Sequence, residues 1–482
     1  MTEAFLGIDL GTTAVKAAVL TATGACLARF ARAYPTMRPG PGLAEQDPQD
    51  WMNLIGAALT EFAGAGLRVG HGCLSSQVNT HVFIDSSGRA LAPAILWQDT
   101  RAAAEAAELD AMLTQDQKIA LLGAPIPIDA SHPLARMLWM ARHRPEIWRQ
   151  TAHMLLPKDY CLLQLTGQVV TDPLANVGLV GPDLRFVGPI LDLVQGAAQR
   201  MAPLAGVTEV VGRTRPEFAM SGIQMVNGTM DGWAGLVGAG ATREGASVWL
   251  SGTSEVLGMC ADHVAGTPGV VVFPAVGGLR LHAGPTQSGG ASQLWFCDMA
   301  GVSVRDLTEA LIATPRRKGT PLFLPHLAGE RAPLWDASLR GAFLGLEAGM
   351  ERVDLGRAVL EGVALSGRHV LEALQASCGV ASGALFCGGG GFLSDPWGQI
   401  RADVVNRPLN RLAVNEPVVL GAVAMAIVSA GGTLAEAQAG LAVYDKVWLP
   451  DAMRRGLYDD LFGLYLEAVA ANVGIGRKLA RL

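Results

Sequence analysis

The sequence predicts an α/β protein with two domains, and three observations carry this prediction. The chain has 482 residues, more than the roughly 250 to 300 that one hydrophobic core serves. Half of the residues are hydrophobic and 17% are charged, which supplies a large core and excludes a disordered chain. GIDLGTTAV from residue 7 and VWLSGTSEV from residue 248 share a strand, a Gly-Thr-[Ser/Thr] turn and a second strand. This internal repeat predicts two domains of one ancestral design.

The first half opens with a predicted β-meander. Residues 5–34 contain three apolar runs separated by a GTT turn and a TATG turn, a pattern that predicts three strands. Residues 47–66 start with Asp and Pro, continue with periodic apolar positions and end in glycines, which predicts a helix. We expect further strands within 71–77 and 80–91, and then a mostly helical stretch over about 99–165.

The polar segment ATREGAS at 241–247 precedes a second meander, so we place the domain boundary there and expect domains at 1–243 and 244–482. After about Gly349 we expect mostly helices, interrupted by a short strand and a glycine-rich turn at 388–391, and then a helical tail on the second domain. The longest apolar run, VVLGAVAMAIVSA at 418–430, is shorter than the roughly 20 residues that a membrane helix needs. It therefore predicts a buried core helix.

Composition limits the partners. The net charge of −6 argues against nucleic acid or an anionic membrane, since both need a basic face, and favours a neutral or small substrate. Seven cysteines without a C-x-x-C pair are typical of a reduced compartment. Because the first strand leaves no room for a signal peptide, we expect a cytoplasmic protein.

The GTT turn of the first meander has the chemistry of a phosphate site. Glycine allows a tight turn, and threonine hydroxyls with successive backbone N–H groups can hold phosphate oxygens. This assigns Gly11, Thr12 and Thr13 to a nucleotide, with Lys16 as an added cation. Asp9 at the end of the first strand suits Mg²⁺ or its water. The alternative is a plain β-hairpin turn, because short motifs match often.

Two further segments carry candidate site residues. Four glycines in CGGGGFLSDPW, including Gly389, Gly390 and Gly391, let adenine or ribose lie against backbone, with Ser394 or Asp395 as a helix cap; a simple strand-to-helix turn is the alternative. Asp231 starts a glycine-rich helix and could accept a proton from a hydroxyl that attacks phosphorus. A turn or N-cap is its alternative.

Gln77 and Asn79 lie two positions apart in LSSQVNTHVF, so an extended chain places both on one face. Their amides both donate and accept hydrogen bonds and therefore suit sugar hydroxyls. The alternative is a pair of satisfied polar groups at a strand end. Neither a Walker A sequence nor a Rossmann glycine pattern occurs, so a nucleotide must be held in another way.

With these residues assembled, the chain resembles the FGGY carbohydrate kinases of the sugar kinase, Hsp70 and actin superfamily, most closely the xylulokinase branch. The resemblance extends over nearly the whole chain, through GIDLGTT, PAILWQDTR, LLPKDYCLLQLTG, MDGWAGLVGAG, LSGTS, LAGERAPLWDASLRGAFLGL and CGGGG…DPWGQIRADV. It implies two ribonuclease H-like domains with an interdomain cleft, ATP with Mg²⁺ as donor, and a ketose or polyol as acceptor. Homodimers are common among similar proteins.

The resemblance also implies roles for individual residues. Asp231 would be the catalytic base, and Asp9 with the GTT turn the metal and phosphate loop. A second phosphate loop would comprise Gly252, Thr253 and Ser254, and Gly389 to Gly391 would contact adenosine. The first domain would hold the sugar and the second domain the nucleotide.

The chain departs from the xylulokinase pattern at two places that line the sugar pocket in the family. Where xylulokinases typically read Gln-Met-His-Gly, this chain has Gln77, Val78, Asn79 and Thr80; where they read Asp-Asn-Ala, it has Asp231, Gly232 and Trp233. Lost hydrogen-bonding groups change which hydroxyl pattern a site accepts. Kinases of glycerol or a pentitol, an actin-like or Hsp70-like ATPase, and a sugar sensor without catalysis are the alternatives.

Overall fold

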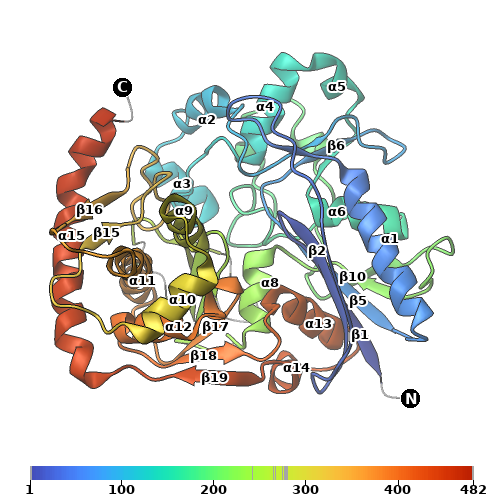
Figure 1. The fold of residues 1–482 in the computed structure, drawn as a ribbon. Helices are drawn as coiled ribbons and strands as arrows, with labels where there is room; N and C mark the ends of the chain where they lie inside the picture. Colours follow the sequence, from blue (N-terminus) through green and yellow to red (C-terminus); the bar gives the residue numbers. More distant parts are fainter. Residues whose placement is uncertain are drawn as a thin grey trace. The chain divides into compact units, whose positions relative to one another are not determined.

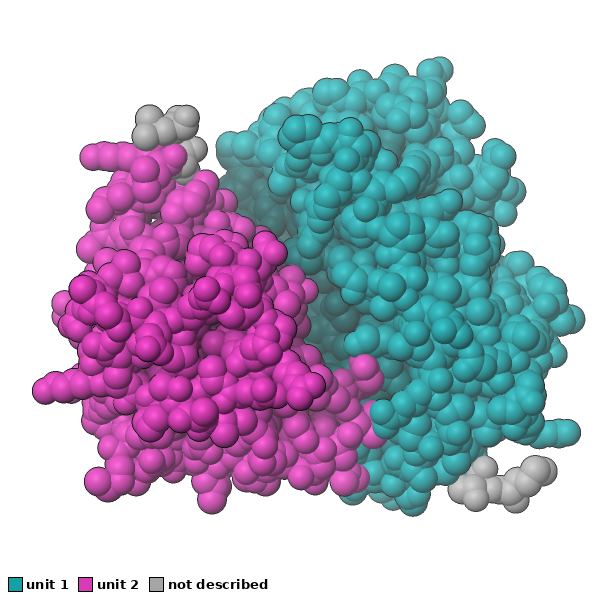
Figure 2. Space-filling view, viewed as in Figure 1, with its two compact units in different colours: residues 1–238, 417–442 teal, residues 239–416, 443–482 magenta. Residues whose placement is uncertain are grey.

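The structure is a computed structural model that describes residues 3–241, 243–263, 265, 267–273, 275 and 280–479. The chain forms an α/β fold with two compact units (Figures 1 and 2). Unit 1 comprises residues 1–238 and 417–442, and unit 2 comprises residues 239–416 and 443–482. The predicted boundary at 243/244 treats the two halves as consecutive, whereas the chain returns to unit 1 for residues 417–442.

The sheet of unit 1 has six strands in the order β3-β2-β1-β5-β10-β9. Their bounds are β1 (Ala4–Leu10), β2 (Ala14–Thr21), β3 (Cys26–Ala33), β5 (His71–Ser76), β9 (Val210–Arg213) and β10 (Gln224–Val226). The first three strands are antiparallel, which confirms the predicted meander. β5 runs parallel to both β1 and β10. Three parallel strands therefore end at the same edge of this sheet.

The sheet of unit 2 repeats this plan. Its order is β13-β14-β12-β11-β17-β18-β19, with bounds β11 (Ser247–Ser251), β12 (Glu255–Ala261), β13 (Val271–Val272), β14 (Arg280–Pro285), β17 (Leu385–Gly388), β18 (Leu409–Leu412) and β19 (Tyr444–Trp448). An antiparallel set β14-β12-β11 is followed by β17 and β18, which run parallel to β11. The predicted repeat and the ribonuclease H-like plan are both confirmed.

Helices surround both sheets (Figure 1). Those of unit 1 are α1 (Pro48–Gly64), α2 (Ala103–Asp110), α3 (Gln115–Leu122), α4 (Pro133–His143), α5 (Pro145–Gln150), α6 (Pro157–Thr166), α7 (Gly188–Leu191), α8 (Asp231–Gly238), α13 (Pro417–Ser429) and α14 (Leu434–Leu441). Those of unit 2 are α9 (Gly290–Ala300), α10 (Val304–Ala313), α11 (Arg352–Cys378), α12 (Asp395–Val405) and α15 (Arg455–Leu479). Short strand pairs are β4 (Glu45–Gln46) with β7 (Ala94–Ile95), β6 (Val82–Ile84) with β8 (His153–Leu155), and β15 (Leu322–Leu324) with β16 (Ala342–Leu344).

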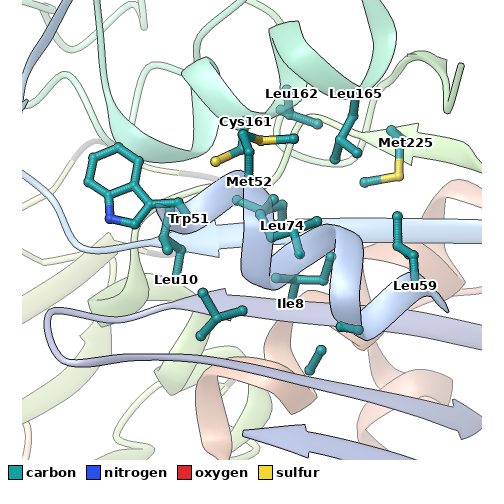
Figure 3. Close-up of a cluster of buried hydrophobic side chains, with 14 of the residues drawn as sticks. Ile8, Leu10, Trp51, Met52, Leu59, Leu74, Cys161, Leu162, Leu165 and Met225 are labelled. Carbon is teal, nitrogen blue, oxygen red and sulfur yellow. The ribbon is translucent and has the colours of Figure 1, made fainter. Parts of the chain in front are cut away.

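Helix α1 shows how local sequence and burial agree. Asp47 caps it by accepting a hydrogen bond from the Gln49 backbone N–H, and Pro48 occupies the first turn. Its apolar face packs on the sheet of unit 1, where Trp51 and Leu59 lie against strand residues such as Ile8 (Figure 3). This contact covers one face of the sheet with a helix.

Helix α13 is the buried core helix that the apolar run predicted, and it packs on α8, β1 and β5. Its contact with α8 requires glycine. A Cβ at Gly421 would lie 1.8 Å from the Ala234 carbonyl oxygen, and one at Gly238 would lie 1.9 Å from the Pro417 carbonyl oxygen. The close contact fixes α8, the helix that begins at Asp231. Among the described residues, the chain has no helix whose length and apolar character would let it cross a membrane.

Candidate active site

Several of the predicted unit 1 residues follow strands that end at one edge of the sheet. The Gln77 backbone N–H donates to the Leu10 carbonyl oxygen at 3.0 Å, and Ser76 forms a parallel bridge with Met230. Gly11, Gln77 and Asp231 therefore come directly after neighbouring segments. The carboxyl edge of parallel strands is where ligands bind in open α/β sheets.

The GTT loop closes the hairpin between β1 and β2, so the hairpin alternative is also correct as a description of its backbone. The Gly11 N–H donates to the Ala14 carbonyl oxygen at 3.1 Å. Asp9 is 7% exposed and lies opposite Lys16 in the strand pair. A Cβ at position 11 would lie 3.7 Å from both carboxylate oxygens of Asp9. Glycine thus leaves the space beside this carboxylate open.

The carboxylate and hydroxyl groups beside Gly11 fit one mode in which proteins bind Mg²⁺. Mg²⁺ usually takes one or two carboxylates, with waters and substrate phosphates completing its ligands. Asp9 supplies such a carboxylate next to a loop with hydroxyl groups. The described residues contain no cluster of three or more His, Cys, Asp or Glu side chains that could hold a metal without phosphate.

A closed ring of hydrogen bonds ties the GTT loop to Gln77. Gln46 Nε2 donates to the Thr12 carbonyl oxygen at 2.7 Å, and Gln77 Nε2 donates to Gln46 Oε1 at 3.0 Å. Thr80 Oγ1 donates to Gln77 Oε1 at 3.2 Å and accepts from the Trp97 N–H at 3.2 Å. Trp97 Nε1 closes the ring on Thr12 Oγ1 at 3.0 Å. Both ends of the Gln77 amide are therefore engaged within the protein.

The extended geometry that would place Gln77 and Asn79 on one face does not occur. β5 ends at Ser76, and Asn79 has a left-handed backbone with φ of 56°, a conformation that Asn tolerates better than most residues. Gln77 is only 1% exposed, because its side chain turns into the ring. Asn79 and Val78 are half-buried, and Asn79 Nδ2 donates to Ser131 Oγ at 3.2 Å. Gln77 and Asn79 consequently do not share a strand face.

Asp231 is the first residue of α8, as predicted. Its Oδ1 accepts a hydrogen bond from the Gly232 backbone N–H at 2.7 Å, and the side chain is half-buried. The helix N-terminus stabilises a carboxylate at this position. An ionised carboxylate is the state that a general base requires.

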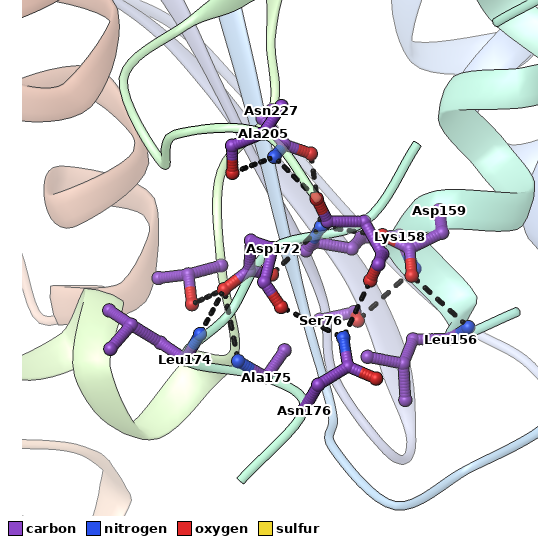
Figure 4. Close-up of polar contacts among 12 residues, drawn as sticks. Ser76, Leu156, Lys158, Asp159, Asp172, Leu174, Ala175, Asn176, Ala205 and Asn227 are labelled. Atoms are coloured by element: carbon purple, nitrogen blue, oxygen red, sulfur yellow. Dashed lines mark hydrogen bonds and ion pairs between the residues drawn. The ribbon is translucent and has the colours of Figure 1, made fainter. Parts of the chain in front are cut away.

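A buried charge cluster behind this edge was missed by the sequence reasoning (Figure 4). The Lys158 Nζ lies 2.5 Å from Asp159 Oδ1 and 3.0 Å from Asp172 Oδ2. Burial lowers the pKa of Lys158, but the two aspartates outweigh it and raise the pKa above its ordinary value, so the amine stays charged. A signal was present, since LLPKDYCLLQL places charges inside an apolar run, where an unpaired charge is costly.

The cluster holds the backbone that precedes two site residues. The backbone N–H of Lys158 donates to Ser76 Oγ at 3.2 Å, and Ser76 directly precedes Gln77. Thr229 Oγ1 donates to Asp172 Oδ1 at 2.7 Å, two residues before Asp231. Residues of this one cluster therefore contact the segments that precede both Gln77 and Asp231.

The second predicted phosphate loop lies in unit 2. Gly252, Thr253 and Ser254 connect β11 to β12, and Thr253 is exposed. The first backbone N–H groups of α9 reach this loop, since those of Gly290 and Ala291 donate to the carbonyl oxygens of Gly252 and Thr253 at 2.9 and 3.0 Å. The helix N-terminus thus fixes the loop backbone.

The glycine run lies at the same edge as this loop. β17 is parallel to β11, and Leu250 pairs with Gly388. Gly389 has φ of 96°, and a Cβ there would lie 2.4 Å from the Ser251 carbonyl oxygen. The glycine run therefore also forms a strand-to-helix turn, which is the alternative interpretation of this segment. Ser394 occupies the N-cap position of α12 without making a side-chain cap hydrogen bond.

Comparison with known proteins identifies the class. The N-terminal domain of the FGGY family of carbohydrate kinases matches residues 4–238, and the C-terminal domain of that family matches residues 193–430. A xylulose kinase of Escherichia coli strain K12 is 31% identical, with 94% of this chain and 96% of that protein covered. The chain therefore belongs to the FGGY family and is a carbohydrate kinase, which confirms the predicted class and implies ATP and a small-molecule sugar as substrates.

Two further relatives show the range of this similarity. The crystal structure of a ligand-bound xylulose kinase from Lactobacillus acidophilus has a TM-score of 0.88 and 25% identity, covering 98% of this chain and 99% of that one. A gluconokinase of Bacillus subtilis is 28% identical, with 84% of this chain and 83% of that protein covered. Similar chains are thus named for different acceptors.

Proposed function

We propose that this kinase phosphorylates a ketose, D-xylulose or a related pentulose, at a hydroxyl group, and that Asp231 is the general base. One observation carries the proposal: Gln77, the GTT loop and Asp231 follow neighbouring segments at one edge of the unit 1 sheet. Unit 1 holds the acceptor and the first phosphate loop in this proposal, and unit 2 holds the nucleotide. We expect the enzyme to act in the cytoplasm, since all seven cysteines are free thiols.

Asp231 accepts the proton of the acceptor hydroxyl as that oxygen forms its bond to the terminal phosphorus of ATP. The bond between that phosphorus and the bridging oxygen breaks, and ADP leaves. Phosphoryl transfer passes through a loose transition state, so positioning and charge stabilisation contribute more than covalent chemistry. The hydrogen bond from Gly232 to Asp231 holds the carboxylate in place for this transfer.

The nucleotide contacts come from backbone-rich loops. Gly11, Thr12 and Thr13 offer N–H and hydroxyl groups to phosphate oxygens, Lys16 adds positive charge, and Asp9 is the carboxylate that would hold Mg²⁺. Bound magnesium neutralises charge on the transferring phosphoryl group. In unit 2, the residues for the second phosphate loop and for adenosine are Gly252, Thr253, Ser254, Gly389, Gly390 and Gly391.

The residues proposed to contact the acceptor differ from those of xylulokinases. Asn79 and Gly232 stand where xylulokinases typically have His and Asn, and Val78 where they have Met. A polyol such as glycerol or a pentitol is the second candidate, because Gly232 lacks a hydrogen-bonding side chain and Asn79 offers an amide in place of an imidazole. ADP release measured across pentuloses, hexuloses, gluconate, glycerol and four- to five-carbon alditols tests both. Highest kcat/KM with a pentulose supports the proposal, and ADP release that is independent of any acceptor contradicts it.

Replacing Asp231 with Asn tests the base assignment. The amide keeps the shape of the side chain but cannot accept the proton, and general base catalysis contributes about 10²- to 10⁴-fold. We expect kcat to fall by that factor while the Kd for ADP stays within about twofold of wild type. Near-normal turnover of Asp231→Asn would show that another group takes the proton.

A further inference from the structure

We propose that Glu255 and Arg401 are positioning residues for the nucleotide: a buried ion pair that holds the loop 252–254 and the loop 389–391 in one fixed geometry. The proposal rests on the nucleotide role proposed above for these two loops. Neither side chain reaches solvent, since Glu255 is 1% and Arg401 0% exposed. They therefore act through the loops and do not touch the nucleotide.

Glu255 stabilises the end of β11, the strand that precedes the loop 252–254. It is the first residue of β12, directly after Ser254. Its Oε2 accepts from Trp249 Nε1 at 2.8 Å, and its Oε1 accepts from Ser251 Oγ at 2.8 Å. Both of these partners belong to β11, the strand that precedes the loop. The carboxylate thus joins the strands on either side of residues 252–254.

Arg401 connects Glu255 to the second loop, residues 389–391. One guanidinium nitrogen, Nη2, forms the ion pair with Glu255 and also donates to Ser251 Oγ at 2.9 Å. The other, Nη1, donates to the Gly391 carbonyl oxygen at 2.7 Å. A single planar group therefore connects the ends of both loops.

Aromatic rings hold the guanidinium in place. Its central carbon lies 3.8 Å from the ring centroid of Trp397 and 4.4 Å from that of Phe392. Arginine suits this site because its flat, forked group stacks on rings while it donates in two directions. Lysine would keep the charge but could not reach Gly391 and Ser251 in the same fixed directions.

The hydrogen bonds of the pair are concentrated on the two loops and their flanking strand. A buried ion pair is often no more stabilising than apolar side chains of the same volume, because desolvation offsets the attraction. The pair is therefore better explained by the structure that it fixes than by added stability. It fixes the spacing between the phosphate loop and the adenosine loop.

The test compares Glu255→Gln and Arg401→Lys with a matched control, Arg316→Lys. Arg316 forms an ion pair with Glu361 at 2.8 Å, also nearly buried and also in unit 2. Titration calorimetry gives the Kd for ADP, steady-state kinetics give KM for ATP and for the acceptor, and thermal unfolding gives Tm. Glu255→Gln is nearly isosteric, so it keeps the test valid if Arg401→Lys fails to fold.

We expect both pair variants to weaken ADP binding and raise the KM for ATP by about tenfold or more, because small displacements of positioning groups are costly. The acceptor KM stays within about twofold, and Arg316→Lys lowers Tm without changing the Kd for ADP. Unchanged ADP affinity in both pair variants, or an equal loss in Arg316→Lys, overturns the proposal.

A loop variant separates this proposal from the one on which it rests. Thr253→Glu puts a negative charge on this exposed loop residue, where it would repel a bound phosphate. If Thr253→Glu binds ADP like the wild type, the nucleotide role of the loop is wrong, and with it the positioning role. If Thr253→Glu loses affinity while Glu255→Gln and Arg401→Lys do not, only the positioning role is wrong. Loss of affinity in all of them supports both proposals.

Discussion

The two units support their site edges with different buried cations. In unit 1 the compact ammonium of Lys158 contacts Asp159, Asp172 and, at 3.3 Å, the side-chain oxygen of Asn227. In unit 2 the guanidinium of Arg401 pairs with Glu255 and spans from one glycine loop to the next. Both cations are fully buried. The partners of Lys158 surround its single amine, whereas the guanidinium of Arg401 connects two separate loops.

The difference follows from what each edge has to hold. In unit 1 the backbone before Gln77 and the backbone before Asp231 converge on one cluster, so a small cation with several acceptors suffices. In unit 2 the Gly-Thr-Ser loop 252–254 and the all-glycine loop 389–391 follow the paired strands β11 and β17, and the glycine loop has no side chains of its own to stabilise it. The rigid, forked guanidinium of Arg401 suits the task of connecting the two loops in unit 2. Lys and Arg are therefore not interchangeable at these two sites.

The largest expected effect is the loss of the unit 1 cation. Lys158→Met leaves two buried aspartates without their partner, and breaking a buried pair costs about 3 to 5 kcal/mol of unfolding free energy. Urea unfolding measures it. Lys446→Met is the control, since the exposed Lys446–Asp395 pair at 3.0 Å should contribute less than about 1 kcal/mol. Equal losses in the two variants would show that the cluster is unimportant.

The next effect concerns Glu330, a carboxyl group of unit 2 for which burial outweighs the charge of the neighbouring Arg331. Burial raises the pKa of Glu330 from 4.5 to about 7, although the Arg331 backbone N–H donates to it. Between these values the unfolded chain releases the proton first. Stability is therefore full below pH 4.5 and falls as the pH rises to about 7, by about 3 kcal/mol in total.

Glu330→Gln checks this contribution, because the amide does not titrate. Unfolding free energy measured from pH 4.5 to 7.5 should decline less steeply in the variant than in the wild type. Parallel curves for the two proteins would mean that Glu330 does not carry the pH dependence of unit 2.

The smallest expected effect is on the hydrogen-bonded ring of unit 1. Trp97→Phe removes the bond from Nε1 to Thr12 Oγ1 and keeps most of the packing. One hydrogen bond contributes about 1 kcal/mol, so we expect a change of about fivefold in the KM for ATP or acceptor. Wild-type values of both KM would show that the ring does not position the GTT loop.

Much of the fold could be predicted from local patterns. Turn residues between apolar runs marked the first meander, the Asp47-Pro48 start marked α1, and the apolar run at 418–430 marked α13. These features depend on nearest neighbours along the chain, which the sequence displays directly. Membership of α13 in unit 1 did not follow from its position, because the chain crosses between the units three times.

The candidate site divides in the same way. The sequence by itself determined the residue types: the carboxylates Asp9 and Asp231, the GTT and GTS turns, and the glycine run, since each requires a chemistry that only certain side chains provide. Tertiary structure decided that Gln77 turns into a buried ring and that Lys158 and Arg401 lie behind the loops. Such contacts join segments up to 150 residues apart, as between Arg401 and Ser251, and spacing along a chain does not encode which distant polar group a buried charge will meet.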